Sequence, residues 1–226
     1  MFQAIRFRKM IIPGVMLLLL LLFINQQAYL PVSILLLGLA CVPFFLRYEK
    51  KQLRAEEISL IALLGTAAAV SRLPFASLPG IQPTSFIIFM TALVFGVETG
   101  FMVGAFAAII SNLFLGQGPW TPWQIFAWGM MGASTGLWRN QWWMISRIGK
   151  SLYGFLWGVI FGWIMNLWVV IGFLEAVNWR TAAAVFAASF YFDLVHGISN
   201  GILLFVFAAR WERMLTRVKS KYGLLQ

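Results

Sequence analysis

The sequence predicts an all-α polytopic membrane protein with eight membrane spans and both termini in the cytoplasm. Hydrophobic residues make up 61% of the chain and charged residues only 11%, whereas soluble domains carry about 25% charged residues. Apolar runs recur along the whole chain, and most approach the roughly 20 residues that a helix needs to cross a bilayer. The lysines and arginines gather between these runs, as they do in cytoplasmic loops.

The first apolar runs predict an N-terminal transmembrane hairpin over 1–46. A basic cluster precedes the first run, as in a signal peptide, but no small-residue cleavage site follows, and "FINQQAYLP" leads directly into the next run. The charged stretch "RYEKKQLRAEE" (47–57) is expected to be a cytoplasmic linker. The expected apolar runs are 11–24, 28–46, 57–73, 83–96, 98–115, 123–138, 151–174 and 181–209.

The stretch 83–115 decides the topology, because it is long enough for one long helix or two short ones. If the chain turns at "FGVETG", near Glu98, fifteen of the 17 lysines and arginines lie inside and only Arg72 and Arg180 lie outside. A single span would reverse everything downstream and leave eight inside and nine outside. The positive-inside rule therefore favours two helices.

This topology gives a six-helix core over 58–210 and a basic cytoplasmic tail over 211–226. The two prolines of "GQGPWTPWQ" fix backbone angles, so this loop is expected to form a shaped outer surface. Tryptophans at a membrane boundary also serve as anchors, and that interpretation stays open for Trp120 and Trp123. The outer segments are "PFASLPGIQPTS" (74–85), "GQGPWTPWQ" (116–124) and "EAVNWR" (175–180).

Polar residues inside the apolar runs mark a second candidate region. Asp193, His196 and Asn200 follow at spacings of three and four, which places them on one helix face. Exposure of Asp193 to lipid would be costly, so this face is expected to point into the bundle or a wet cavity. A structural Asp–His pair, a substrate contact and a proton relay all remain open. Asn112 and Asn166 are expected to hydrogen-bond between helices.

Small residues four apart occur in the expected helix 57–73. They pair Ala62 with Thr66 and Gly65 with Ala69. Such spacing lets two helices approach closely in lipid. The pattern is consistent with internal packing or with a docking face for another membrane subunit.

Most enzyme and metal chemistry is disfavoured. The single cysteine, Cys41, excludes an intrachain disulfide and a multi-cysteine metal site. "IGKS" (148–151) lacks the first glycine of a phosphate-binding loop. "GASTG" (132–136) fits Gly-x-Ser-x-Gly, which leaves an intramembrane protease with Ser134 and His196 as an alternative. We expect no enzyme activity, no bound metal and no nucleic-acid partner.

Residues 58–210 resemble the substrate-binding S component of energy-coupling-factor (ECF) vitamin transporters. The resemblance rests on "IALLGTAAAVSRLPF", "LPGIQPTSFIIF", "SNLFLGQGPWTPWQIFAWGMMG" and "FDLVHGISN". The loop and the last helix are most similar to the group assigned to cobalamin and related corrinoids. The resemblance implies an outward-facing pocket capped by loops. It also implies a transmembrane coupling subunit, EcfT, and two cytoplasmic ATPases that use ATP, while this subunit holds no cofactor.

Together these observations and the resemblance predict a substrate-binding subunit of an ATP-driven vitamin importer in the plasma membrane, with cobalamin or a related corrinoid as the transported substrate. Tryptophans offer flat apolar area to a corrin ring, and amide side chains match its amide rim. An ion-coupled permease with Asp193 and His196 as a proton relay is the alternative. The expected substrate-binding residues are Arg72, Gln82, Asn112, Gln117, Trp120, Trp123, Gln124, Trp128, Asp193 and His196. The expected contact with the coupling subunit is formed by Ala62, Gly65, Thr66 and Ala69.

Overall fold

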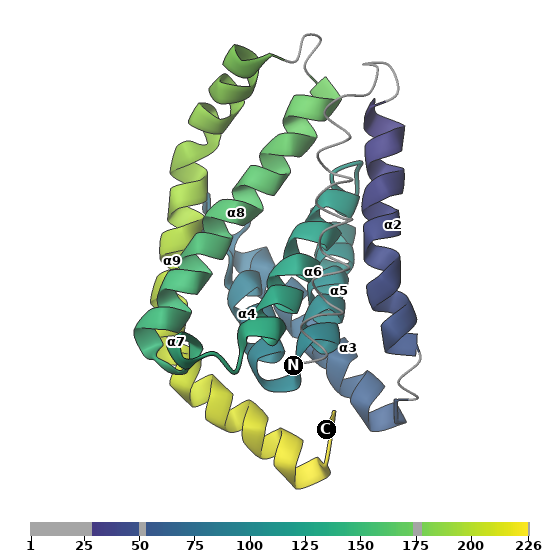
Figure 1. The fold of residues 1–226 in the computed structure, drawn as a ribbon, viewed down its shortest axis with the longest axis vertical. Helices are drawn as coiled ribbons and strands as arrows, with labels where there is room; N and C mark the ends of the chain where they lie inside the picture. The colour runs from purple at the N-terminus through teal and green to yellow at the C-terminus, as the bar shows by residue number, and fades with distance from the viewer. Residues whose placement is uncertain (1–28, 50–52, 174–177, 226) are drawn as a thin grey trace.

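The computed structural model describes residues 29–49, 53–173 and 178–225. A short 3₁₀ helix, η2 (Leu73–Phe75), follows the second described helix. No strand occurs within the described ranges, so the expected all-α class is confirmed for them. The helices in Figure 1 are α2 (Tyr29–Glu49), α3 (Ala55–Arg72), α4 (Pro83–Phe95), α5 (Val97–Leu115), α6 (Thr121–Trp138), α7 (Trp142–Ile145), α8 (Arg147–Phe173) and α9 (Trp179–Tyr222).

Four of the described helices are long and apolar enough to cross a membrane, namely α3, α5, α8 and α9. The helix α4 is apolar but has only 13 residues, which span about 20 Å at about 1.5 Å per residue. The expected run at 11–24 lies outside the described residues. The eight-span count and the side on which the termini lie therefore stay predictions.

The chain turns between α4 and α5, where the charge distribution predicted a turn. The residue that joins the two helices is Gly96, whose φ is +95°. This backbone conformation suits glycine, which has no Cβ to clash with the neighbouring carbonyl groups. The stretch 83–115 is therefore two helices, as expected.

Helix α4 lies at the centre of the bundle and packs against α3, α5, α6 and α9. Its residues from Thr84 to Phe95 are all buried, which is typical of a helix that is apolar on every side. The few polar side chains near its start, Gln82 and Ser85 among them, therefore need partners inside the protein.

Helices α5 and α6 approach each other closely through glycines. A Cβ at Gly132 would lie 2.2 Å from the carbonyl oxygen of Gly100, and one at Gly104 would lie 2.5 Å from that of Trp128. Contacts this short exclude any side chain at Gly132 and Gly104 without movement of the helices. This packing fixes the height and rotation of Trp128 in the bundle.

Of the stretch expected to form an N-terminal hairpin, the structure describes α2, which packs against α5 and α6; the hairpin itself stays a prediction. Phe44 stacks on Phe101 with ring centroids 4.1 Å apart and planes at 6°. The helix runs to Glu49 and the next begins at Ala55, so both ends of the expected linker 47–57 are helical.

Helix α9 is longer than the expected apolar run 181–209. It has 44 residues, or about 66 Å at about 1.5 Å per residue, twice the roughly 30 Å of a hydrocarbon core. The helix passes through the expected boundary between core and tail at 210 and ends at Gly223, whose φ is +59°. The basic stretch that follows the apolar run is therefore mostly helix.

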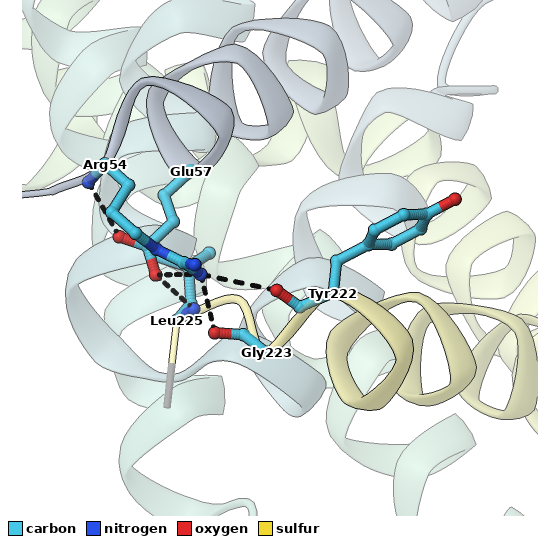
Figure 2. Close-up of polar contacts among 5 residues, drawn as sticks. All are labelled: Arg54, Glu57, Tyr222, Gly223 and Leu225. Carbon is cyan, nitrogen blue, oxygen red and sulfur yellow. Dashed lines mark hydrogen bonds and ion pairs between the residues drawn. The ribbon is translucent and has the colours of Figure 1, made fainter.

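The two ends of the bundle carry different side-chain contacts. At one end, Arg72 of α3 contacts Asn112 of α5 beside the Pro/Gly-rich loops; we call this the loop end. At the other, the basic end, the start of α3 meets the end of α9. Figure 2 shows Arg54 Nη2 donating to the carbonyl oxygen of Gly223 at 2.7 Å, and Glu57 Oε1 accepting from the Leu225 amide at 2.6 Å.

Candidate functional site

A chain of hydrogen bonds joins three helices at the loop end. Arg72 Nη1 donates to Ser111 Oγ at 2.9 Å and to Asn112 Oδ1 at 3.0 Å. Asn112 Nδ2 in turn donates to Gln124 Oε1 at 2.7 Å and to Thr121 Oγ1 at 3.0 Å. The last turns of α3 and α5 and the first turn of α6 are therefore held together by side chains, and the loops start from fixed points.

The aromatic loop between α5 and α6 is itself anchored. Thr121 Oγ1 donates to Gln117 Oε1 at 2.9 Å, and Gln117 Nε2 donates to the carbonyl oxygen of Ile109 at 3.0 Å. The ring of Trp120 covers Gly118, because a Cβ there would lie 2.4 Å from the ring. The loop therefore has the shaped surface that its proline content predicted.

The three expected tryptophans lie at different depths. Trp120 is half-buried, with its ring centroid 6.4 Å from that of Trp168 of α8. Trp123 and Trp128 are completely buried. The guanidinium carbon of Arg72 lies 5.2 Å from the Trp128 ring centroid, within cation–π range. Of the three rings, only that of Trp120 offers area at the surface; the other two lie inside the bundle.

A second polar chain crosses the bundle below Arg72. Trp128 Nε1 donates to Ser85 Oγ at 3.1 Å, and Ser85 Oγ lies 2.9 Å from His196 Nε2. Because the serine oxygen already accepts from Trp128, its own proton is available for the histidine nitrogen. The ring of His196 also meets the edge of Phe161 at 5.2 Å between centroids. This chain ties α4, α6 and α9 together at a completely buried histidine.

Asp193 belongs to a separate cluster between α8 and α9. Its Oδ2 accepts from Ser189 Oγ at 2.8 Å and from Asn166 Nδ2 at 3.4 Å. A Cβ at Gly162 would lie 1.9 Å from Asp193 Oδ1, so the carboxylate occupies the space that this glycine leaves. The Asp–His pair that the spacing left open is not formed, because His196 bonds to α4 and Asp193 bonds toward α8.

Some buried polar atoms have no hydrogen-bond partner among the described residues. Gln82 lies at the start of α4 and Trp123 in the first turn of α6, both at the loop end. Buried polar groups are ordinarily satisfied, so each of these atoms calls for a partner such as a water molecule or a ligand. The four atoms are Gln82 Oε1, Trp123 Nε1, His196 Nδ1 and Asn200 Oδ1.

A comparison with protein families assigns the chain to a class. The family model described as ECF-type riboflavin transporter, S component, matches residues 53–213. The match covers well over half of the chain, from just before α3 to the last third of α9. The chain belongs to this family. In the corresponding comparisons, no curated protein and no solved structure matches it.

The family membership confirms the coarser part of the sequence prediction. The protein is an S component, the substrate-binding membrane subunit of an ECF transporter, and S components associate with EcfT and ATPase subunits. The corrinoid-specific group is not confirmed by this match, since the family's description names riboflavin.

The S component's Gly-x-Ser-x-Gly stretch is explained by packing. Gly132 and Gly136 lie against the backbone of the neighbouring chain segments, at Gly100 and Val97. Ser134 Oγ donates to a carbonyl oxygen of its own helix. No hydrogen bond joins this serine to His196 in the described structure, and the geometry gives the protease alternative no support.

The expected contact face for the coupling subunit divides in two. Ala62 and Thr66 are exposed, whereas Gly65 and Ala69 are buried. A Cβ at Gly65 would lie 2.8 Å from the Cβ of Phe106, so this glycine serves the packing of α3 on α5. Only Ala62 and Thr66 of the expected set remain accessible to a partner in this structure.

Sequence reasoning missed three polar members of these chains, namely Ser85, Ser111 and Thr121. Ser85 and Ser111 carried the same signal as Asn112, a polar residue inside an apolar run. Thr121 lies at the first helical position after the loop, where its hydroxyl also accepts from the Gly118 amide at 3.3 Å. A systematic search for polar residues in apolar runs would have found the two serines.

Proposed function

We propose that this S component binds a corrinoid such as cobalamin at its loop end, and that the coupling subunit and ATPases use ATP to drive its release inside the cell. Two observations support the proposal: the resemblance of the loop motif to the corrinoid group, and the polar side chains that lie near Trp120. The chain itself performs no covalent chemistry in this scheme. The plasma membrane and an outward-facing loop end are part of the same proposal.

The observation that carries the choice of substrate is the environment of Arg72. Its partners among the described residues are neutral: the Ser111 hydroxyl, the Asn112 amide oxygen and the face of Trp128. A half-buried cation without an anion is costly, and a ligand that supplies one gains a charge-assisted hydrogen bond. Cobalamin carries a phosphodiester anion, whereas riboflavin carries no charge. Arg72 therefore favours the corrinoid.

The remaining polar groups suit the amide rim of a corrin. Gln117 is exposed, and Thr121 is half-buried between it and Asn112. Amides that donate and accept at the same time can exchange their mutual bonds for bonds to substrate amides at little net cost. The exposed part of Trp120 adds an aromatic surface for the ring.

Riboflavin is the second candidate, because the matching family model names it. A flavin ring would lie against the same aromatic surface. It would use the amide side chains but leave the Arg72 charge without an anion. The two candidates therefore differ in one measurable property, the contribution of a substrate phosphate to binding.

The test is made with purified protein in detergent, without its partner subunits. The protein is mixed with cobalamin, with cobinamide, which lacks the phosphodiester, or with riboflavin, and each mixture is passed over a sizing column. We expect corrin absorbance in the protein peak near one ligand per chain for cobalamin and weaker retention of cobinamide. Retention of riboflavin alone would overturn the corrinoid assignment and leave the S-component class intact.

A further inference from the structure

A basic cavity lies between α8 and the second half of α9, far from the loop end. Its volume is about 640 Å³. Arg147 and Lys150 line it from the start of α8, and Arg213 and Arg217 line it from α9, with Glu212 beside them. Four cations thus face one carboxylate across a hollow large enough for a phosphate-bearing headgroup.

The charges of this cavity are only partly neutralised. Lys150 and Glu212 form an ion pair with each other. Arg213 Nε donates to the carbonyl oxygen of Ala209, a neutral acceptor. Within the described ranges, Arg147, Arg213 and Arg217 make no ion pair. The cavity therefore presents three guanidinium groups to a ligand, and guanidinium is well matched to phosphate oxygens.

A separate apolar groove lies between the same two helices. It has a volume of about 300 Å³ and is lined by Leu152 and Phe155 of α8 and by Ile202, Phe205 and Val206 of α9. Ser151, which also lines the groove, is four residues past Arg147, and Val206 is seven residues before Arg213. Offsets of four and seven place groove and cavity residues on one face of each helix, one to two turns apart.

The position of the cavity matches the depth of lipid headgroups. Trp142 lies in α7, whose last residue, Ile145, lines the cavity, and it is 81% exposed. Ile148 and Leu152 of α8 are each 64% exposed. Tryptophan at the border of an apolar surface marks the membrane–water interface. These exposed side chains favour a position of the basic cavity at headgroup level, with the apolar groove in the hydrocarbon region.

We propose that an anionic phospholipid binds between α8 and α9, with its phosphate among Arg147, Arg213 and Arg217 and an acyl chain in the apolar groove. Basic pockets between transmembrane helices bind such headgroups. A lipid fits better than an acidic protein segment, because a protein segment would leave the apolar groove unused. The inference does not depend on the identity of the vitamin.

The test measures the melting temperature (Tm) of the full chain in detergent with added phosphatidylglycerol or with phosphatidylcholine of the same acyl chains. A ligand that binds only the folded state raises Tm. We expect phosphatidylglycerol to raise Tm and phosphatidylcholine to have a much smaller effect. Arg213→Gln should lose most of the rise, whereas Arg210→Gln, an exposed arginine on the same helix outside the cavity, should keep it.

Two further Tm measurements distinguish a lipid from a free phosphate. Glycerol phosphate, the headgroup without chains, should give little rise, and Val206→Trp, which fills the apolar groove, should weaken the effect of phosphatidylglycerol. An equal rise with glycerol phosphate would overturn the lipid proposal in favour of a free anion. An equal loss in Arg210→Gln would show non-specific charge attraction. The lipid proposal would also be overturned if an acidic partner subunit bound at the groove while phosphatidylglycerol left Tm unchanged.

Discussion

The guanidinium of Arg72 lies over the buried ring of Trp128, with 5.2 Å between the guanidinium carbon and the ring centroid. This contact joins the two polar chains of the protein, because Arg72 holds Asn112 at the loop end and Trp128 holds Ser85 inside the bundle. A substrate that bonds to Arg72 would therefore contact a residue linked through Trp128 and Ser85 to α6, α4 and α9. If substrate binds at Arg72 as proposed, this residue pair couples binding to the packing of the bundle.

Replacing Arg72 by glutamine should weaken cobalamin binding. Hydrogen bonds to charged groups contribute about 1.5–3 kcal/mol, so we expect a loss of about 10- to 100-fold in affinity. Cobinamide affinity should change much less, because that ligand lacks the phosphodiester. Titration calorimetry with both corrinoids measures the difference.

The matched control is Arg180→Gln at the same end of the bundle. Arg180 is exposed and lies over Trp179 at 5.4 Å, so it repeats the cation–aromatic contact without the polar chain. Its removal should leave both affinities unchanged. Equal losses for cobalamin and cobinamide in Arg72→Gln would instead assign Arg72 a purely structural role.

Alanine variants of Trp120 and Trp123 should distinguish an effect on ligand affinity from an effect on stability. Trp120 is half-buried at the loop surface, so Trp120→Ala should weaken ligand binding with a small change in Tm. Trp123 is completely buried, and Trp123→Ala should cost about 3–5 kcal/mol of stability through the cavity that it leaves. Thermal melting and ligand titration on both variants measure the separation. A larger loss of Tm in Trp120→Ala than in Trp123→Ala would contradict it.

The sequence predicted the boundary between α4 and α5, which local chemistry sets. Gly96 takes a positive φ that favours glycine, and the distribution of lysine and arginine pointed to a turn at the same place. The loop around Trp120 was predicted to be shaped, because its prolines restrict the backbone wherever they occur. Features of this kind depend on neighbours in the chain and can be predicted from them.

The partners of buried side chains could not be predicted in the same way. Spacing placed Asp193 and His196 on one helix face, but the helices opposite that face decide that one bonds toward α8 and the other to Ser85. The small residues of α3 were likewise recognised, but their spacing does not say that Gly65 faces Phe106 while Ala62 stays exposed. These outcomes depend on how helices rotate against each other.

The separation of Asp193 from His196 predicts that no proton relay operates through this pair. Asp193→Asn keeps an amide oxygen for the Ser189 hydroxyl, so binding and ATP-driven uptake should persist. Uptake into proteoliposomes that contain the complete transporter measures this, with and without a pH gradient. Uptake that requires the gradient and is lost in Asp193→Asn would restore the permease alternative.

The glycines of the Gly-x-Ser-x-Gly stretch should matter for packing, and its serine should not. A Cβ at Gly132 would lie 2.2 Å from the carbonyl oxygen of Gly100, so Gly132→Ala must push α5 and α6 apart. Overpacking of this kind typically costs about 1–3 kcal/mol, and the displaced α6 carries Trp128. We expect a lower Tm together with weaker ligand binding.

The control lies two residues away in the same stretch. Ser134 Oγ donates to the Met131 carbonyl oxygen of its own helix and also interacts with the Tyr153 side chain, so Ser134→Ala should change Tm and binding much less than Gly132→Ala. A protease would show the opposite order, with activity lost in Ser134→Ala. Thermal melting and ligand titration on the two variants therefore decide whether this stretch serves helix packing or chemistry.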